Sequence, residues 1–191
     1  MSSIKKKGIL EAATRSFETF GYKATTMSQI AKQANVGKGT IYTFFKNKEE
    51  LFDEIINNLI LDMKNVADNS ICDTDSFVTK VHKGIDAIME FQTEHDLTIK
   101  LLQEQREFGT IAVHDAIKRL NDGIILYLKR KIEEAIDRNE IVQCDAEITA
   151  VVLYRLYTAL TIDWSKDHKP LDKQRITELF NFYILNGLSK G

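Results

Sequence analysis

The sequence predicts an all-α protein, and three observations lead to this fold class. Its 191 residues include one proline, Pro170, and nine glycines, so long stretches lack helix-breaking residues. Runs of β-branched residues bounded by turn residues are missing. Apolar residues instead recur at spacings of three and four, the period of an amphipathic helix. With 43% hydrophobic and 28% charged residues, the chain is globular in composition and long enough for one or two domains.

The N-terminal segment predicts two helices, the second of which is followed by a tight turn. The first helix runs from about Ile4 to Phe20, and Gly21 suits its C-terminal cap. The second begins at Thr26, which can form a capping box with Gln29 three residues later. Asn35 then stands where the turn requires a positive φ, which asparagine tolerates better than most residues.

Two further helices follow this turn. The third is short, from Lys38 to about Phe45, and its inward face is formed by Ile41, Phe44 and Phe45. Asn47 caps a long fourth helix, whose apolar stripe is Leu51, Phe52, Ile55, Ile56, Leu59, Ile60 and Met63. The polar segment "NSICDTDS" (69–76) is the best candidate for a domain boundary. We therefore expect an N-terminal domain over residues 3–63 and a helical C-terminal domain over residues 73–191.

The C-terminal half predicts helices around 77–89, 97–102, 113–138, 146–164 and 176–188. Apolar residues go nearly all the way round the helix 146–164, which Asp145 caps. A helix that is apolar on most sides must be covered on most sides. We therefore expect one face to pack within its own domain and another against a partner subunit, together with the last helix. The predicted dimer-interface residues are Leu156, Leu160, Phe180 and Ile184.

Charge is distributed unevenly along the chain. The formal net charge is −2, but residues 1–48 hold nine basic and two acidic residues, a net of +7. The remaining 143 residues hold 17 basic and 26 acidic residues, a net of −9. This asymmetry favours a basic module for a polyanion, although a solvated basic face without a partner would give the same count.

Several classes of protein are disfavoured. The basic N-terminal segment lacks the apolar run of a signal peptide, and no apolar stretch is long enough to span a membrane, so we expect a cytoplasmic protein. Cys72 and Cys144 are too few for a disulfide framework, and the four histidines do not pair at a metal-ligand spacing. No nucleophile elbow, P-loop or nucleotide-binding glycine turn is present, so we expect neither an enzyme nor a bound cofactor.

The segment "TTMSQIAKQANVGKGTIYTFFKNK", residues 25–48, has the pattern of a helix-turn-helix, in which the second helix enters the DNA major groove. Its predicted exposed side carries cations and hydroxyl groups that suit phosphates, and threonines small enough to approach base edges. The candidate DNA-contacting residues are Thr25, Thr26, Ser28, Lys38, Gly39, Thr40, Tyr42, Thr43, Lys46 and Lys48. Tyr42 could instead be a partly exposed aromatic residue without a partner. For Lys5, Lys6 and Lys7, a flexible arm touching DNA and a solvated tail are equally favoured.

The stretch "TTMSQIAKQANVGKGTIYTFFKNKEELF" resembles the N-terminal signature of TetR-type transcriptional regulators, and the similarity covers about residues 3–63. Two positions depart from that signature: Asn35 replaces the usual glycine, and Gly37 replaces the serine that usually caps the recognition helix. The resemblance implies a homodimeric repressor that binds a near-palindromic double-stranded DNA operator. It also implies a C-terminal domain that holds the dimer interface and a pocket for a small-molecule effector.

The C-terminal half supplies more large apolar residues than one helix pair needs, which allows a mainly hydrophobic effector to bind between helices. The candidate ligand-binding residues are Met89, Phe91, Leu102, Gln105, Arg106, His114, Ile117, Tyr154 and Tyr157. For the tyrosines and Trp164, helix packing is the alternative interpretation, and for Arg106 and His114 it is a surface position. An enzyme, or an interaction module that has lost DNA binding, remains the competing class of function.

Overall fold

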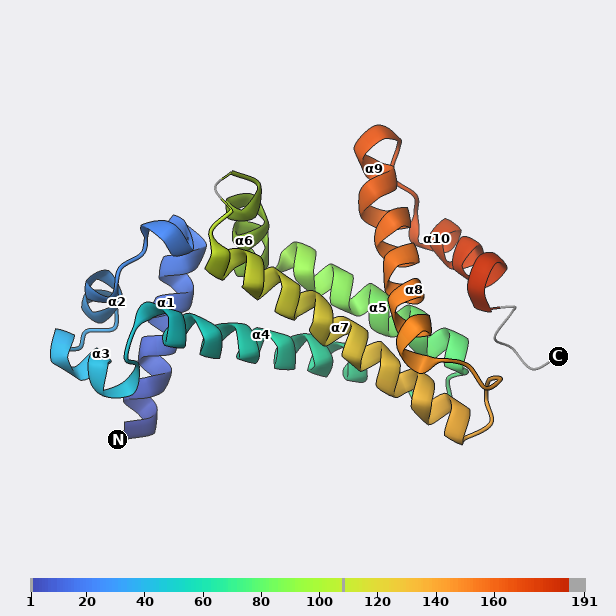
Figure 1. Ribbon diagram of the computed structural model, residues 1–191, viewed down its shortest axis with the longest axis horizontal. Coiled ribbons are helices and arrows are strands. Elements are labelled where there is room, and N and C mark those ends of the chain that lie inside the picture. The colour runs from blue at the N-terminus through green and yellow to red at the C-terminus, as the bar shows by residue number, and fades with distance from the viewer. Residues whose placement is uncertain (1, 108, 186–191) are drawn as a thin grey trace. The chain divides into compact units, whose positions relative to one another are not determined.

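Every regular element in the part of the chain that the structure describes is a helix (Figure 1), which confirms the predicted all-α fold class. This computed structural model describes the backbone of residues 2–107 and 109–185 and the side chains of residues 3–107 and 109–183. The elements are α1 (Ser2–Ala24), α2 (Met27–Gln33), α3 (Lys38–Phe44), α4 (Lys48–Ser70), α5 (Phe77–Glu94), α6 (Asp96–Glu107), α7 (Ile111–Asp137), α8 (Ala146–Thr158), the π-helix η1 (Ala159–Asp163), α9 (Trp164–Asp167), α10 (Lys173–Phe180) and the π-helix η2 (Asn181–Leu185).

The chain divides into two compact units. Unit 1 comprises the residues up to Asp62 together with Glu90–Asn121, and unit 2 comprises Met63–Met89 together with the residues from Asp122 onward. The helices α4, α5 and α7 each contribute to both units. This division by contacts differs from the predicted one, because α6 packs against α1 within unit 1. The limits 3–63 and 73–191 for separate DNA-binding and effector-binding domains therefore stay a prediction.

Gly21 interrupts α1, as the sequence predicts, but the helix then resumes for a turn. The glycine has φ +81° and ψ 165°, in the region that side-chain-bearing residues rarely adopt. Beyond it, the backbone N–H groups of Tyr22 and Lys23 donate to the Glu104 carboxylate of α6, at 2.6 and 2.9 Å. The carboxylate thus satisfies the donors that a new helical turn leaves free at its start.

The core of unit 1 holds α1 and α4 together through three aromatic rings. Phe17 of α1 contacts Tyr22 and Phe52 at centroid distances of 5.6 and 5.3 Å, and Tyr22 lies 4.5 Å from Phe52. All three side chains are buried. Edge and tilted contacts of this kind stabilise beyond the area that they bury, by about 0.5–1.5 kcal/mol per pair. Residues of α6 and α7, including Leu97 and Leu101, are also buried in unit 1.

The predicted helix 146–164 begins at the predicted cap but is not a regular α-helix throughout. Asp145 accepts hydrogen bonds from the N–H groups of Glu147 and Ile148, which confirms the cap. After Thr158 the chain widens into η1 before α9 begins. In this stretch the hydroxyl group of Thr161 donates to the Tyr157 carbonyl at 2.8 Å. Hydroxyl groups that bond to carbonyls four residues earlier disturb the regular helical ladder.

Unit 2 buries Phe180, and this corrects the prediction that Phe180 lies in a subunit interface. Only 1% of its surface is exposed, and its ring makes an edge contact with Tyr157 at 6.0 Å. The hydroxyl group of Tyr157 in turn donates to Asp86 at 2.9 Å. Phe180 is therefore a core residue of one subunit. The side chain of Ile184, and the residues predicted to continue the last helix to 188, lie outside the described residues.

Among the residues that the structure describes, no helix combines the length and apolar character needed to cross a membrane.

Candidate nucleic-acid interface

The helices α2 and α3 are joined by a turn whose hydrogen bonds fix their relative position. Thr26 and Gln29 form the predicted capping box at the start of α2. At its end, Asn35 adopts the predicted positive φ of 52°, and its N–H donates to the Lys32 carbonyl at 3.2 Å. The N–H of Val36 donates to the Ala31 carbonyl at 3.0 Å. This pairing of bonds around a left-handed residue is a helix-terminating motif, which turns the chain directly into α3.

One side of the helix pair is buried in unit 1. In α2 the buried residues are Met27, Ile30 and Ala31. Ile41 of α3 and Phe45 just after it are also buried, whereas Phe44 is half-buried. The predicted apolar face is therefore confirmed. Because this side is covered, the opposite side of α3 is the one available to a partner.

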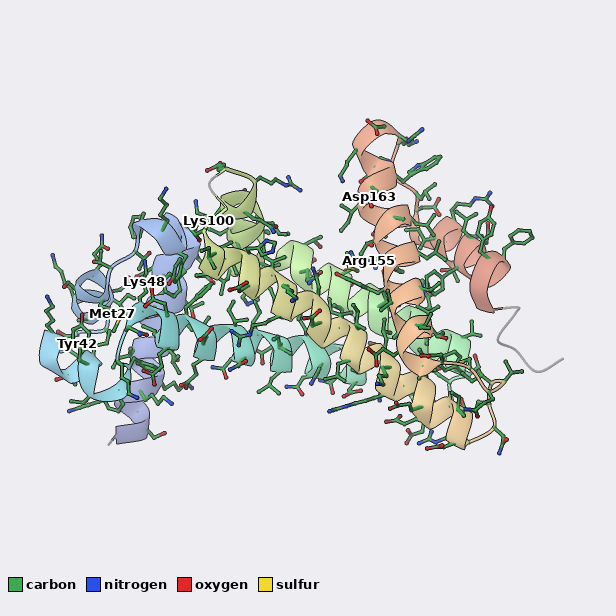
Figure 2. The ribbon with its side chains drawn as sticks, viewed as in Figure 1. Met27, Tyr42, Lys48, Lys100, Arg155 and Asp163 are labelled. Atoms are coloured by element: carbon green, nitrogen blue, oxygen red, sulfur yellow. The ribbon has the colours of Figure 1, made fainter. Side chains whose placement is uncertain are left out.

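The opposite side is exposed, polar and basic. Tyr42 retains 45% of its surface and Lys48 lies at the start of α4 (Figure 2). Thr40 is half-buried, and the hydroxyl group of Thr43 donates to its carbonyl at 2.7 Å. The residues of the α2–α3 exposed face are Thr26, Ser28, Lys38, Gly39, Thr40, Tyr42, Thr43 and Lys46. None of the ammonium groups of this face takes part in an ion pair within the described residues, so they remain available to an external anion.

Thr25 was predicted to donate to phosphate, and the structure corrects this. Its side chain is 1% exposed, and its hydroxyl group lies 2.7 Å from the Gly21 carbonyl and 3.1 Å from the Ser16 carbonyl. The hydroxyl proton is used inside unit 1. Thr25 therefore fixes the segment between α1 and α2 and is not a surface donor.

Lys48 also has an internal role that the sequence does not reveal. Its ammonium group donates to the carbonyl groups of Tyr22 and Thr25, at 2.8 and 2.9 Å, and lies 4.2 Å from the centroid of the Tyr22 ring. Burial lowers the pKa of Lys48, although the carboxylates of Glu49 and Glu104 oppose this. Only one of the three ammonium protons remains for a phosphate.

Lys48 and Glu104 both bind the backbone of residues 22–25, Lys48 as a hydrogen-bond donor and Glu104 as an acceptor. Glu104 accepts from the N–H groups of Tyr22 and Lys23, and Lys48 donates to the carbonyl groups of Tyr22 and Thr25. The Tyr22 hydroxyl group donates to Glu49 at 3.0 Å, and burial raises its pKa. This cluster sets the position of the chain that leads into α2. No sequence signal identifies Glu104, because its partners lie about 80 residues away.

The basic N-terminal residues belong to a helix and do not form a flexible arm. They lie in α1, which begins at Ser2. Lys6 makes an ion pair with Glu54 at 2.8 Å, and its ammonium group lies 5.4 Å from the Phe45 ring. Lys7 lies 4.0 Å from Glu11. The arm interpretation is therefore corrected for these two lysines.

The nine candidate effector-binding residues are distributed between the two units. Unit 2 contains Met89, Tyr154 and Tyr157, all buried. Unit 1 contains Phe91, Leu102, Gln105, Arg106, His114 and Ile117. Leu102 is exposed in the single chain, which contradicts its predicted inward position, and His114 and Arg106 are exposed as well. Burial of Tyr154 raises its pKa. Whether these residues form one pocket stays a prediction.

No group of three potential metal ligands occurs among the described residues, and Cys72 and Cys144 are both free thiols.

Comparisons with known proteins agree with this geometry. Residues 9–55 match the model of the family "Bacterial regulatory proteins, tetR family". Over 189 residues, 99% of each chain, the protein is 53% identical to the HTH-type transcriptional regulator YhgD of Bacillus subtilis (strain 168). It is 25% identical over 185 residues to the fatty acid metabolism regulator protein of the same organism, which covers 94% of this chain and 93% of that one.

Solved structures share the fold. The transcriptional regulator FadR from Bacillus subtilis, in complex with stearoyl-CoA, has a TM-score of 0.67 at 21% identity and covers 95% of this chain and 98% of its own. The complex of SmeT with triclosan has a TM-score of 0.69 at 19% identity, covering 98% and 92%. The 53% identity over nearly the whole of both chains, with the family match over α2 and α3, settles the family. The chain belongs to the tetR family of bacterial regulatory proteins and is a transcriptional regulator, not an enzyme.

Proposed function

We propose that this regulator is a cytoplasmic homodimeric repressor that binds a near-palindromic operator through the α2–α3 exposed face. The observation that carries the proposal is the two-sided character of α3, with Ile41 buried on one side and Tyr42 and Thr43 exposed on the other. A helix held by its apolar side presents its polar side to the major groove. Lys38 and Lys46 neutralise phosphates, Tyr42 donates to a phosphate oxygen, and Thr43 meets base edges.

The apolar surface of α8 supports assembly into a dimer. Ile148 and Val152 of α8 are exposed, and Leu156 of α8 and Leu160 of η1 follow at steps of four residues and are half-buried. We call these four residues the α8–η1 apolar stripe. An exposed stripe of this kind marks a site of association with another protein surface. Two copies related by a two-fold axis would bury the stripes against each other and present two recognition helices to a two-fold symmetric operator.

Two of the comparisons support a mainly hydrophobic effector. A sequence match is a fatty acid metabolism regulator of Bacillus subtilis, and a solved structure of a regulator from the same organism contains stearoyl-CoA. A long-chain acyl-CoA is therefore the first candidate to test on this chain. A ligand releases DNA only when it binds the DNA-free form more tightly than the DNA-bound form.

The test is a calorimetric titration of stearoyl-CoA into the protein, with and without a saturating amount of an operator selected from random DNA. Thermodynamic linkage requires that ligand and operator weaken each other by the same factor. We expect weaker binding of stearoyl-CoA when operator is present. Equal affinities in the two titrations would contradict release by this ligand. A separate titration of operator at increasing salt should show a steep loss of affinity, because phosphate contacts release counterions.

A further inference from the structure

The side chain of Lys48 joins the two ends of the segment that carries α2 and α3. Thr25 directly precedes Thr26, the N-cap of α2, and Lys48 is the first residue of α4. The Lys48 ammonium group donates to the Thr25 carbonyl at 2.9 Å and to the Tyr22 carbonyl at 2.8 Å. We call residues 25–48 the helix-turn-helix segment. A hydrogen bond between its first and last residues therefore closes this segment into a loop.

The turn between α2 and α3 makes this closure important for the position of α3. The N–H groups of Asn35 and Val36 donate to carbonyl groups of α2 and fix the angle between the two helices. Below them, Ile30 and Ile41 are buried. Because α2 and α3 are held together in this way, a displacement of the start of α2 also displaces α3.

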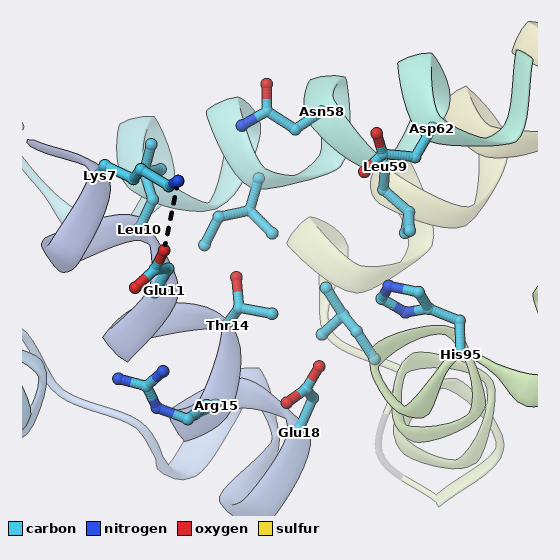
Figure 3. Close-up of a pocket in the computed structure, with 12 residues that line it drawn as sticks. Lys7, Leu10, Glu11, Thr14, Arg15, Glu18, Asn58, Leu59, Asp62 and His95 are labelled. Atoms are coloured by element: carbon cyan, nitrogen blue, oxygen red, sulfur yellow. Dashed lines mark ion pairs between the residues drawn. The ribbon is translucent and has the colours of Figure 1, made fainter. Parts of the chain in front are cut away.

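Lys48 differs from lysines on the surface of the same unit. Lys6 and Lys7 of α1 form ion pairs with the carboxylates of α4 and α1, and Figure 3 shows the pair of Lys7 with Glu11. Exposed pairs of this kind contribute little to stability. Lys48 is half-buried, and its ammonium group also lies 4.2 Å from the centroid of the Tyr22 ring. Two carbonyl groups and an aromatic face thus hold it in one place.

The charge of Lys48 is also balanced within unit 1. The carboxylates of Glu49 and Glu104 attract its ammonium group, and two of its three protons are used by carbonyl groups. Lys46, two residues earlier, is exposed, and its ammonium group makes no ion pair with any residue that the structure describes. Lys46 and Lys48 therefore carry the same charge in different surroundings, and Lys46 is the better phosphate ligand of the two.

We propose that Lys48 is a positioning residue for operator recognition, whose ammonium group fixes the start of α2 against the start of α4 and does not bind a DNA phosphate. Base edges are read only when α3 lies in the correct register, whereas phosphates attract a basic surface in any register. Loss of Lys48 therefore lowers affinity for the operator more than affinity for unrelated DNA. This inference rests on the proposed function of the α2–α3 exposed face.

The experiment compares Lys48→Met with Lys46→Met, because each substitution removes one positive charge per subunit. Fluorescence anisotropy measures binding of a selected operator and of unrelated DNA of equal length over a range of salt concentrations. Each phosphate contact contributes about 0.9 to the slope of log affinity against log salt concentration. We expect Lys46→Met to lower this slope by about 0.9 per subunit and to weaken binding of both DNAs by similar factors.

Lys48→Met should give a different pattern. We expect at least about tenfold weaker binding of the operator, because α3 is no longer held in register. The affinity for unrelated DNA should change by less than about threefold, and the salt slope should stay within about 0.3 of the parent value.

Lys48→Arg keeps the charge and separates the two roles. Arginine binds phosphate at least as well as lysine does, so a phosphate ligand predicts unchanged or tighter operator binding. Its planar group does not match the compact ammonium group between two carbonyl groups and the Tyr22 ring. We therefore expect operator affinity to fall at least about fivefold. Circular dichroism at the assay temperature confirms that each variant is folded, and if Lys48→Met does not fold, Lys48→Arg decides alone.

Three results would overturn the proposal. A salt slope that falls in Lys48→Met as much as in Lys46→Met would make Lys48 a phosphate ligand, and so would full operator affinity in Lys48→Arg. Parental operator affinity in folded Lys48→Met would leave Lys48 a role in stability alone. These results contradict the present inference and leave the proposed function intact. If random DNA yields no operator, the proposed function fails and this inference fails with it.

Discussion

Removal of the Glu104 side chain tests how α6 fixes the DNA-binding helices. Glu104 is 5% exposed, and its two carboxylate oxygens accept the N–H groups of Tyr22 and Lys23. In Glu104→Ala these two N–H groups lose this acceptor, the one of Tyr22 in a buried place and the one of Lys23 in a partly buried place. Gly21 approaches the carboxylate so closely that a Cβ there would lie 2.6 Å from Oε2.

The expected loss in the free energy of unfolding follows from the number and kind of hydrogen bonds that Glu104→Ala removes. A hydrogen bond to a charged group contributes about 1.5–3 kcal/mol, so two such bonds amount to roughly 3–6 kcal/mol. Removing a buried carboxylate also removes the cost of keeping that charge out of water, which offsets part of the loss. We therefore expect Glu104→Ala to lower the free energy of unfolding by about 2–4 kcal/mol. Glu104→Gln should lose less, because its amide oxygen still accepts one N–H.

The assay is urea unfolding followed by circular dichroism, combined with operator binding by fluorescence anisotropy. Glu107→Ala, an exposed carboxylate on the same helix, is the control and should change the free energy of unfolding by less than about 0.5 kcal/mol. Operator affinity should fall in Glu104→Ala, because the segment leading into α2 is no longer held. If Glu104→Ala is as stable as the parent protein, the assignment of Glu104 as the anchor of this segment is wrong.

Three further predictions concern DNA binding, assembly and pH. Tyr42→Ala should weaken binding of a selected operator about tenfold in anisotropy titrations, since one phosphate hydrogen bond and its packing are lost; unchanged affinity would remove Tyr42 from the interface. Val152→Asp should shift the sedimentation of the protein from dimer to monomer, because the new charge would be buried in the interface without a partner. A normal dimer of Val152→Asp would place the interface elsewhere. Phe180→Ala should instead lower the free energy of unfolding of each subunit by about 3–5 kcal/mol. Burial lowers the pKa of His82 below its ordinary value of 6.5, against the attraction of Asp86. The unfolded chain therefore takes up the proton first, so the free energy of unfolding should fall as pH decreases through 6.5, and His82→Gln should flatten this decrease.

Local chemistry made the helix-turn-helix predictable from the sequence. The capping box of Thr26 and Gln29, the positive φ of Asn35 and the buried Ile41 each depend on residues within a few positions of one another. Apolar residues spaced three or four positions apart lie on one side of a helix, so this spacing predicts which side of a short helix is buried. The exposed position of Tyr42 follows from the same spacing.

Contacts between distant parts of the chain were not predictable in this way. Thr25 looks like a surface hydroxyl in the sequence, yet the turn at Gly21 brings its side chain to two buried carbonyl groups. Lys48 looks like a phosphate ligand, yet its long side chain reaches back to the segment between α1 and α2. Phe180 lies on an amphipathic helix whose partner could be the same subunit or another one. Periodicity identifies an apolar face but not the surface that covers it.

Selection of DNA fragments from a random pool by the full-length protein, followed by sequencing, tests the central claim most directly. Recognition by a dimer through two copies of α3 predicts enrichment of one near-palindromic sequence, with half-sites about one helical turn apart or slightly more. The Tyr42→Ala protein should enrich this sequence much less in the same selection. Absence of any enriched sequence, or enrichment of a single half-site without a symmetric partner, would contradict a dimeric repressor that reads its operator with the α2–α3 exposed face.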